Sequence, residues 1–366
     1  MIRSRRRASV AALASFLLIA AACGSDDDTA PSEGADVSDV AVSSAPDSGS
    51  VPSSADRTSE RPTVVVTTNI LGDVVGKVIA DQAEIVTVMP VGADPHDFQA
   101  SAQEIDRLLS ADALIVNGAG FEEGLLDVVE SAENDGVPTY EAITEVSTID
   151  FGAGGHEHGD EGEHGDEGEH GDEGEHSGEE ESGDEHDHDG ADPHFFTDPA
   201  RMAVAVDGIV DFLIAEVDGL DAAELEASAA GYVEALTTVD GEVMDLVAGL
   251  DPESRVLVTN HEVFSYFADR YGFEVVGVVI PGGSTTDAAS AGELAELAEI
   301  IEAEGVPAIF ADTSSSDELA NALAAEVGDV AVVELYSESL GEAGSDGATY
   351  LEMVRANADR IAIALS

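Results

Sequence analysis

Short runs of β-branched residues alternate with segments of helical character along most of the chain, and this alternation restricts the possible folds more than any other feature. Residues 63–68 read TVVVTT, a continuous run that is typical of a strand buried on both faces of a parallel sheet. Strands that alternate with helices are typical of layered α/β folds. The pattern therefore predicts an α/β fold with parallel sheets.

The alternation occurs in two sets, with a long helical segment between them. The first set predicts strands at 63–68, 84–89 and 113–117 and helices at 72–80, 102–109 and 123–131. The second predicts strands at 255–259, 274–279, 308–311 and 330–335 and helices at 262–271, 291–304, 317–326 and 348–365. Residues 221–250 carry apolar side chains at spacings of three and four without a proline, which predicts one helix long enough to brace both sets.

These patterns predict two α/β lobes joined by one linking helix. The expected order is a signal peptide at 1–22, a lipidated cysteine and tether at 23–61, an N-terminal lobe at 62–220 with an insert at 152–190, the linking helix at 221–250, and a C-terminal lobe at 251–366.

The N-terminus has the features of a secretory signal. Four arginines within the first seven residues precede an apolar run at 8–22, which is too short for a permanent membrane helix. Cys23, the only cysteine, directly follows three alanines, as the lipidated cysteine of a bacterial lipoprotein does, although Ala20 stands where leucine is usual. We expect an extracytoplasmic protein anchored to the bacterial cell membrane through Cys23. A secreted protein with one unpaired cysteine is the alternative.

Composition excludes several classes of protein. Residues 23–61 are mostly small and polar, so they predict a disordered tether. The formal net charge of −65 excludes nucleic acid as a partner. A single cysteine also excludes an intrachain disulfide and a zinc site built from several thiolates.

Three of the ten histidines stand alone in sequence of globular character. His96, His194 and His261 each lie near the end of a predicted strand or in a loop, where open α/β sheets place their ligands. Three imidazoles that converge can form a zinc site. The first two histidines follow Asp-Pro, and we expect Asp94 and Asp192 to accept the second ring N–H of their histidines.

The other seven histidines crowd the predicted insert. HGDEGE occurs three times in succession, and the stretch from residue 156 to residue 189 contains seventeen acidic residues and no basic residue. Such sequence cannot bury a core, so it predicts a disordered segment that binds zinc weakly at several places. A tolerated surface insertion with incidental metal affinity is the alternative. The accessory histidines are His156, His158, His164, His170, His176, His186 and His188.

Six stretches, in this order, resemble the zinc/manganese substrate-binding lipoproteins of bacterial ABC importers. They are TTNILGDVVGKV at 67–78, MPVGADPHDFQAS at 89–101, ADALIVNGAGFE at 111–122, DPHFFTDP at 192–199, NHEVFSYFADRYG at 260–272 and YLEMVRANADRIAIAL at 350–365. The resemblance implies a C-clamp of two lobes with metal held between them by His96, His194, His261 and one carboxylate. It also implies a membrane permease and its ATPase as partners, and we expect the chain to act as a monomer.

The carboxylate ligand is the position at which this chain departs from the commoner family pattern. Glu338, in SESLGEAG at 337–344, stands where the family usually has aspartate. Asp312 is the competing ligand, although the corresponding family position usually holds a supporting acid. Phe196 replaces the tryptophan that commonly follows the second Asp-Pro-His motif, which we expect to alter packing and to leave the chemistry of the site unchanged.

The expected ligand set favours Zn²⁺ over Mn²⁺. Three imidazoles and one carboxylate suit four-coordinate zinc better than the oxygen-rich shell that manganese prefers. By resemblance, the manganese members of the family carry glutamate at the position of His261, and the zinc members often carry a histidine-rich loop before the second motif.

Other functions remain open at this point. A zinc hydrolase needs an open coordination position and a general base, and the sequence has neither HExxH nor GxSxG. We therefore do not expect an enzyme. A manganese-binding paralogue and a surface protein for metal buffering or cell adhesion stay as alternatives.

Overall fold

The computed structural model describes residues 61–151 and 190–366. The predicted signal peptide, the lipidation site Cys23 and the tether up to residue 60 lie outside the described residues. So do residues 152–189, which contain the seven clustered histidines.

The N-terminal lobe is built on a sheet of four parallel strands in the order β2-β1-β3-β4. The strands are β1 (Thr63–Val66), β2 (Glu84–Thr87), β3 (Ala113–Val116) and β4 (Thr139–Glu141). β1 and β3 lie in the middle of the sheet. Every residue of these two strands is buried except Thr63, the first residue of β1. This burial on both faces explains why both strands are continuously apolar.

The C-terminal lobe repeats this arrangement with the order β6-β5-β7-β8. Its strands are β5 (Val256–Thr259), β6 (Glu274–Val278), β7 (Ala308–Asp312) and β8 (Ala331–Leu335). In both sheets the first strand is flanked by the next two strands, one on each side. The loops that leave the carboxyl ends of neighbouring strands diverge at such a point, and α/β proteins bind ligands there.

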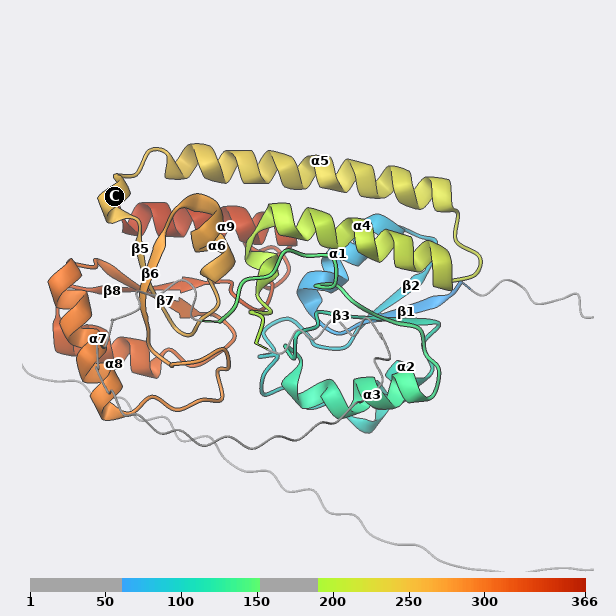
Figure 1. The fold of residues 1–366 in the computed structure, drawn as a ribbon, viewed down its shortest axis with the longest axis horizontal. Coiled ribbons are helices and arrows are strands. Elements are labelled where there is room, and N and C mark those ends of the chain that lie inside the picture. Colours follow the sequence, from blue (N-terminus) through green and yellow to red (C-terminus); the bar gives the residue numbers. More distant parts are fainter. Residues whose placement is uncertain (1–60, 152–189) are drawn as a thin grey trace, which may run out of the picture. The chain divides into compact units, whose positions relative to one another are not determined.

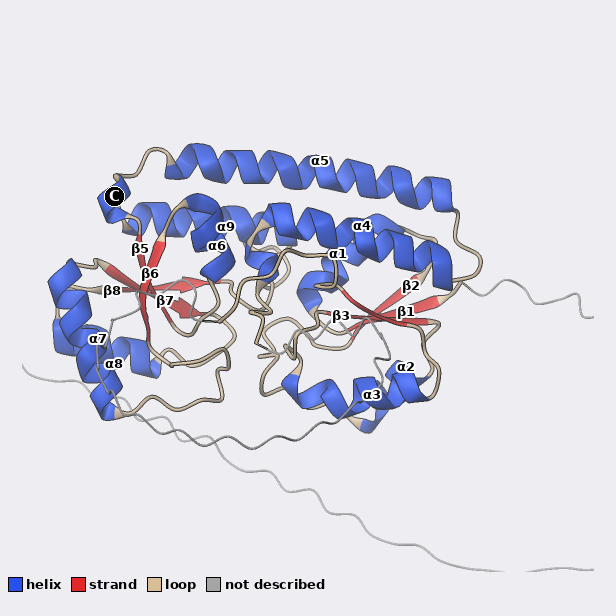
Figure 2. Ribbon diagram, in the orientation of Figure 1, coloured by secondary structure: helices blue, strands red, loops and turns tan. Residues whose placement is uncertain are grey.

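Helices cover both sheets (Figures 1 and 2). The first lobe contains α1 (Asn69–Ile79), α2 (Ala102–Leu109), α3 (Leu126–Asn134) and α4 (Pro199–Glu216). The second contains α6 (Ser265–Tyr271), α7 (Ala291–Glu304), α8 (Glu318–Val327) and α9 (Tyr350–Ala364). The linking helix α5 (Ala222–Val247) contacts α1 and α4 of the first lobe and α6 and α9 of the second.

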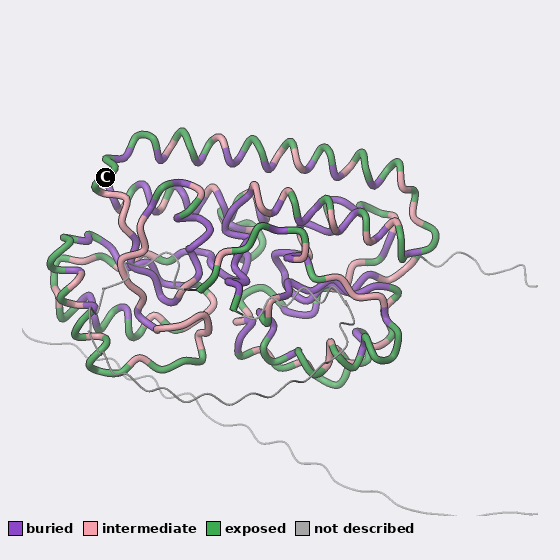
Figure 3. Tube along the Cα trace, in the orientation of Figure 1, coloured by how far each residue is buried: buried purple, intermediate pink, exposed green. Residues whose placement is uncertain are grey.

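A cap at its start and one apolar stripe along its length explain helix α5. Asp221 caps the helix by accepting a hydrogen bond from the backbone N–H of Glu224. Leu225, Leu236 and Val243 belong to the buried stripe, while the opposite face is exposed, so the trace of α5 alternates between buried and exposed residues in Figure 3. The helix is therefore held by packing along one side.

The largest apolar cluster contains residues of both lobes. Val64 of β1, Leu236 of α5, Leu257 of β5 and Ile361 of α9 all belong to it, and each is at most 1% exposed. Smaller clusters pack on the other face of each sheet. The two sheets therefore share one core through α5 and α9.

The predicted fold class is confirmed, and the element boundaries differ by a few residues. Two elements escaped the sequence prediction, β4 and α4. Strand β4 has only three residues, too few for a pattern to appear. Helix α4 is apolar on most sides, so it lacks a clear stripe, although Asp198 as N-cap and Pro199 in the first turn marked its start.

Residues 61–151 and 190–366 contain no helix with both the length and the apolar character needed to cross a membrane.

Candidate metal centre

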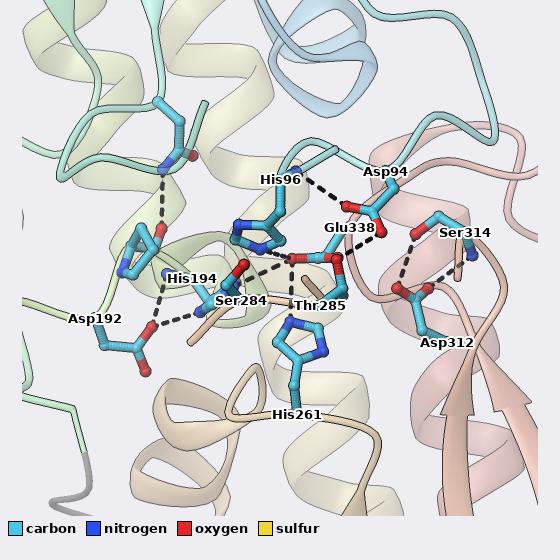
Figure 4. A network of polar contacts seen from close by, with 12 residues as sticks. Asp94, His96, Asp192, His194, His261, Ser284, Thr285, Asp312, Ser314 and Glu338 are labelled. Carbon is cyan, nitrogen blue, oxygen red and sulfur yellow. Dashed lines mark hydrogen bonds and ion pairs between the residues drawn. The ribbon is translucent and has the colours of Figure 1, made fainter. Parts of the chain in front are cut away.

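Four buried side chains converge between the two lobes (Figure 4). His96, His194, His261 and Glu338 each offer a ligand atom, and these atoms lie within 4.8 Å of one another. The Nε2 atoms of the three histidines lie 2.7, 3.3 and 3.1 Å, respectively, from one oxygen, Oε1 of Glu338. None of the four residues is more than 5% exposed. The structure thus brings together three imidazoles and one carboxylate that are distant in sequence.

Both Asp-Pro-His motifs form the same local turn. In each, the aspartate Oδ1 accepts a hydrogen bond from the backbone N–H of the histidine two residues later, at 3.0 Å for Asp94 and 2.9 Å for Asp192. This is the usual turn of an aspartate that bonds its own backbone, and the intervening proline restricts it further. The motif therefore sets the direction in which each histidine leaves the backbone.

The two turns differ in how they hold the imidazole ring. Asp192 Oδ1 also lies 2.7 Å from Nδ1 of His194, as the sequence predicted. The corresponding prediction for Asp94 was wrong. Its second oxygen accepts a hydrogen bond from the hydroxyl of Thr285 at 2.6 Å, and Glu123 instead lies 3.0 Å from Nδ1 of His96.

Sequence reasoning missed Glu123 because it lies 27 residues after His96 and outside the motif. It sits at the start of the 3₁₀ turn η1 (Glu123–Leu125), directly after the buried Glu122. A carboxylate opposite Nδ1 favours the tautomer that leaves Nε2 free for a metal. The acidic pair in GFEE at 120–123 was the one available signal.

The third histidine and the carboxylate each have an atom without a hydrogen bond. Nδ1 of His261 and Oε2 of Glu338 are buried, and neither has a partner among the described residues. Buried polar atoms are usually satisfied, so these two atoms are consistent with a site that binds a further ligand. Both residues lie in loops that leave the carboxyl ends of strands, β5 for His261 and β8 for Glu338.

Asp312, the competing carboxylate, does not belong to the group of four convergent residues. It ends β7, and its two oxygens accept hydrogen bonds from the backbone N–H and the hydroxyl of Ser314, at 2.9 and 2.8 Å. Burial and the neighbouring carboxylate of Glu338 raise its pKa to about 6. Asp312 therefore lies close enough to influence the charge of the site. Its own oxygens are hydrogen-bonded to Ser314.

Aromatic rings pack against the imidazoles. Phe121 lies edge-on to His96, His194 and Phe196, with ring centroids 5.4, 5.5 and 5.4 Å apart. Phe196, at the position where the sequence predicted altered packing, also contacts the ring of His194 at 5.9 Å. Such contacts restrict ring rotation, so the imidazoles are held by packing as well as by hydrogen bonds.

The site is strongly polarised. Burial alone would lower the pKa of His194, but Asp192 and Glu338 outweigh it and raise the pKa to about 9. Burial alone would raise the pKa of Glu338, but the three imidazoles hold it well below its usual range. An ionised carboxylate and at least one protonated imidazole therefore share the site at neutral pH.

This charge state predicts that metal binding releases protons. A histidine binds metal as the neutral imidazole, so below about pH 9 a cation must displace the proton of His194. The apparent affinity for Zn²⁺ is expected to fall as the pH is lowered, by about tenfold per pH unit for each released proton. Zinc titration calorimetry at pH 7.5 in buffers of different ionisation enthalpy measures the number of protons. Equal heats in all buffers would contradict the expected release.

A pocket of about 220 Å³ lies beside the site and reaches His96. His96, Phe121 and Glu123 of the N-terminal lobe line it, together with Gly283, Ser284 and Asp287 of the C-terminal lobe. Glu123 is half exposed there, with a side-chain exposure of 39%. Two carboxylates, Glu123 and Asp287, therefore line this pocket.

The ends of the predicted insert lie beside the same pocket. Asp150 and Ala191 pair as an isolated antiparallel bridge, which closes the base of the insert. Phe151 lines the pocket, and its ring lies 6.4 Å from that of His194. The chain therefore leaves and re-enters the described structure close to the mouth of the site.

Comparisons by sequence and by fold both match this chain to bacterial metal-binding proteins. A family model described as the periplasmic zinc-uptake complex component A matches residues 64–364. The chain is 25% identical over 304 residues to the manganese-binding lipoprotein MntA of Halalkalibacterium halodurans, covering 83% of this chain and 88% of that protein.

A second relative is named for zinc instead of manganese. The zinc-binding protein TroA of Treponema pallidum is 29% identical over 311 residues, covering 84% of this chain and 89% of that protein. Its solved structure, a periplasmic zinc-binding protein, matches with a TM-score of 0.68 at 28% identity, covering 84% of this chain and 99% of that one.

Proposed function

The chain belongs to the family of the periplasmic zinc-uptake complex component A, and from this premise we propose that it is the extracytoplasmic metal-binding component of an ABC importer with Zn²⁺ as its cargo. Members of this family take part in metal uptake, and the chain is not an enzyme. The relatives are named for manganese and for zinc, so the choice of metal depends on the site of this chain.

The observation that carries the proposal is the chemistry of the four convergent side chains. Three imidazole nitrogens and one carboxylate oxygen match the donors and the coordination number of a tetrahedral zinc site. Manganese prefers more oxygen ligands, and by family resemblance its binding proteins have glutamate where this chain has His261. The relatives named for manganese favour the alternative, in which the chain binds Mn²⁺.

In this proposal His96, His194, His261 and Glu338 bind the metal. Two carboxylates hold the first two rings, Glu123 for His96 and Asp192 for His194. Burial of all four ligands excludes water from the bound ion and makes their attraction for a divalent cation stronger than in water. The site therefore favours capture of a scarce cation.

The partners follow from the family and from the N-terminal sequence. The cargo passes to a membrane permease driven by its ATPase, and the chain is anchored outside the cytoplasm through a lipid on Cys23. Two of its relatives are named as lipoproteins, which supports this anchor. The acidic residues and seven histidines between 152 and 189 act as an accessory zinc trap. The protein works as a monomer.

Titration calorimetry of Zn²⁺ and Mn²⁺ tests this function. The chain from residue 24 onward is compared with a variant that lacks residues 156–189. We expect the variant to keep one tight zinc site and to lose only weaker sites, because the four proposed ligands lie outside the deletion. Tighter binding of manganese than of zinc would support the alternative. Loss of the tight site on deletion would refute the assignment of the four ligands.

A further inference from the structure

The segment that carries Glu338 is held by two asparagine side chains, one from each lobe. Asn357 of α9 accepts a hydrogen bond from the backbone N–H of Tyr336 at 2.9 Å and donates one to its carbonyl oxygen at 2.7 Å. Asn69, the first residue of α1, accepts a hydrogen bond from the backbone N–H of Leu340 at 2.7 Å. Glu338 therefore lies midway along a short segment that is fixed on both sides.

Asn69 also contacts the loop that leads to His96. Its amide nitrogen donates to the carbonyl oxygen of Pro90 and to the hydroxyl of Ser339, both at 3.1 Å. The same hydroxyl accepts a hydrogen bond from the backbone N–H of Gly92 at 2.7 Å. One amide thus connects two loops from different lobes, and each loop carries a residue of the candidate site.

These contacts are shielded from solvent. Ser339 is fully buried, and Asn69 is 8% exposed. Buried hydrogen bonds are costly to lose because the groups left behind have no water to replace the partner. The amide of asparagine suits this position because its oxygen accepts a hydrogen bond from the Glu338 loop while its nitrogen donates one to each of the two loops, which neither a hydroxyl nor a carboxylate does in the same shape.

We propose that Asn69 is a positioning residue for the metal ligand Glu338, and that it sets the carboxylate in place against His96. The glutamate side chain has three rotatable bonds, so restraining its backbone on both sides reduces the number of positions that its carboxylate can take around the three imidazoles. Asn69 supplies this restraint from the opposite lobe, and Asn357 supplies the restraint from the same lobe. This inference rests on the proposed function.

A merely structural role for Asn69 predicts a different result. In that case its loss would lower the stability of the protein and leave the coordination of the bound metal unchanged. A positioning role predicts that Glu338 becomes free to move away from the metal, so that water takes its place. The electronic absorption of bound Co²⁺ separates these cases, because it depends on the number and arrangement of the ligands.

The experiment uses Asn69→Ala and Asn69→Asp in the chain from residue 24 onward. Asn69→Asp keeps the acceptor for Leu340 and loses the donors to Pro90 and Ser339. Both variants are titrated with Zn²⁺ and with Co²⁺, and unfolding is followed without metal. We expect zinc affinity to fall by about 10–100-fold, as is typical when a partner of a metal ligand is lost, and the Co²⁺ spectrum to move toward higher coordination.

Two further variants keep the test decisive. Ser339→Ala removes the hydroxyl that links Asn69 and Gly92, and it serves if the Asn69 variants do not fold; a smaller loss of affinity with the same spectral change is expected. Asn321→Ala removes an exposed asparagine that bonds only its own helix turn, and it should match the unaltered chain.

The outcomes separate the two proposals. If Asn69→Ala lowers only the unfolding temperature and keeps the zinc affinity and Co²⁺ spectrum of the unaltered chain, the positioning role is refuted and the proposed function stands. If the unaltered chain itself binds neither zinc nor cobalt tightly, the proposed function is refuted, and the role of Asn69 falls with it.

Discussion

Replacing His261 with alanine is expected to lower zinc affinity by roughly 1,000-fold, or about 4 kcal/mol. In the proposed function, this residue is the ligand that favours zinc over manganese. Its Nε2 lies 3.1 Å from Glu338 Oε1, and the residue is fully buried. Loss of a ligand itself should exceed the 10–100-fold loss that follows removal of a ligand's hydrogen-bond partner. Competition with a chromogenic zinc chelator measures the change.

The matched control for His261→Ala is the same change within the histidine cluster, His186→Ala. It removes an imidazole from the segment that we propose as an accessory trap, so the tight site should be unaffected. If both variants lose a similar small amount of affinity, the tight site does not include His261. If His186→Ala alone weakens tight binding, the histidine cluster itself holds the tightly bound metal.

Replacing Phe121 with alanine is expected to destabilise the protein by about 3–5 kcal/mol and to weaken zinc binding as well. Phe121 is 1% exposed and packs edge-on against His96 and His194. Its removal leaves a cavity beside both imidazoles, so the rings gain freedom that metal binding must again restrict. Chemical denaturation of the metal-free protein gives the stability, and calorimetry gives the affinity.

A second buried phenylalanine separates the two effects of Phe121→Ala. Phe267 is 2% exposed, and its ring contacts Phe264, Tyr271 and Phe273. Phe267→Ala should therefore cause a similar loss of stability with little change in zinc affinity. Equal losses of affinity in the two variants would mean that Phe121 acts only through global stability.

Patterns within a few residues predicted much of the fold. Strands β1 and β3 are recognisable as unbroken apolar runs, and α5 is recognisable because its buried residues recur every three or four positions. The failures came where the period is absent. Strand β4 is too short, and helix α4 is apolar on most sides. Residues 1–60 and 152–189 lie outside the described residues, so the predictions for the anchor and the histidine cluster stay predictions.

In the candidate site too, a contact between residues close in sequence was predicted, and a contact between residues far apart in sequence was not. Asp192 opposite His194 followed from the motif, because two residues of one turn cannot be far apart. Glu123 opposite His96 did not follow, because the partner comes from another loop and Asp94 bonds Thr285 instead. A carboxylate beside a histidine in sequence is thus a candidate partner, and the tertiary contacts decide which oxygen reaches the ring.

By itself, the sequence determined the α/β class, the long linking helix and the three isolated histidines near strand ends, since each depends on residue type and local spacing. Only the tertiary structure decided which groups meet. It brought Glu338 to the three imidazoles, left Asp312 bonded to Ser314, and placed Asn69 between the two loops. The physical reason is that metal ligands and their supports act over a few ångströms, whereas the chain separates Asn69 and Leu340 by 271 residues.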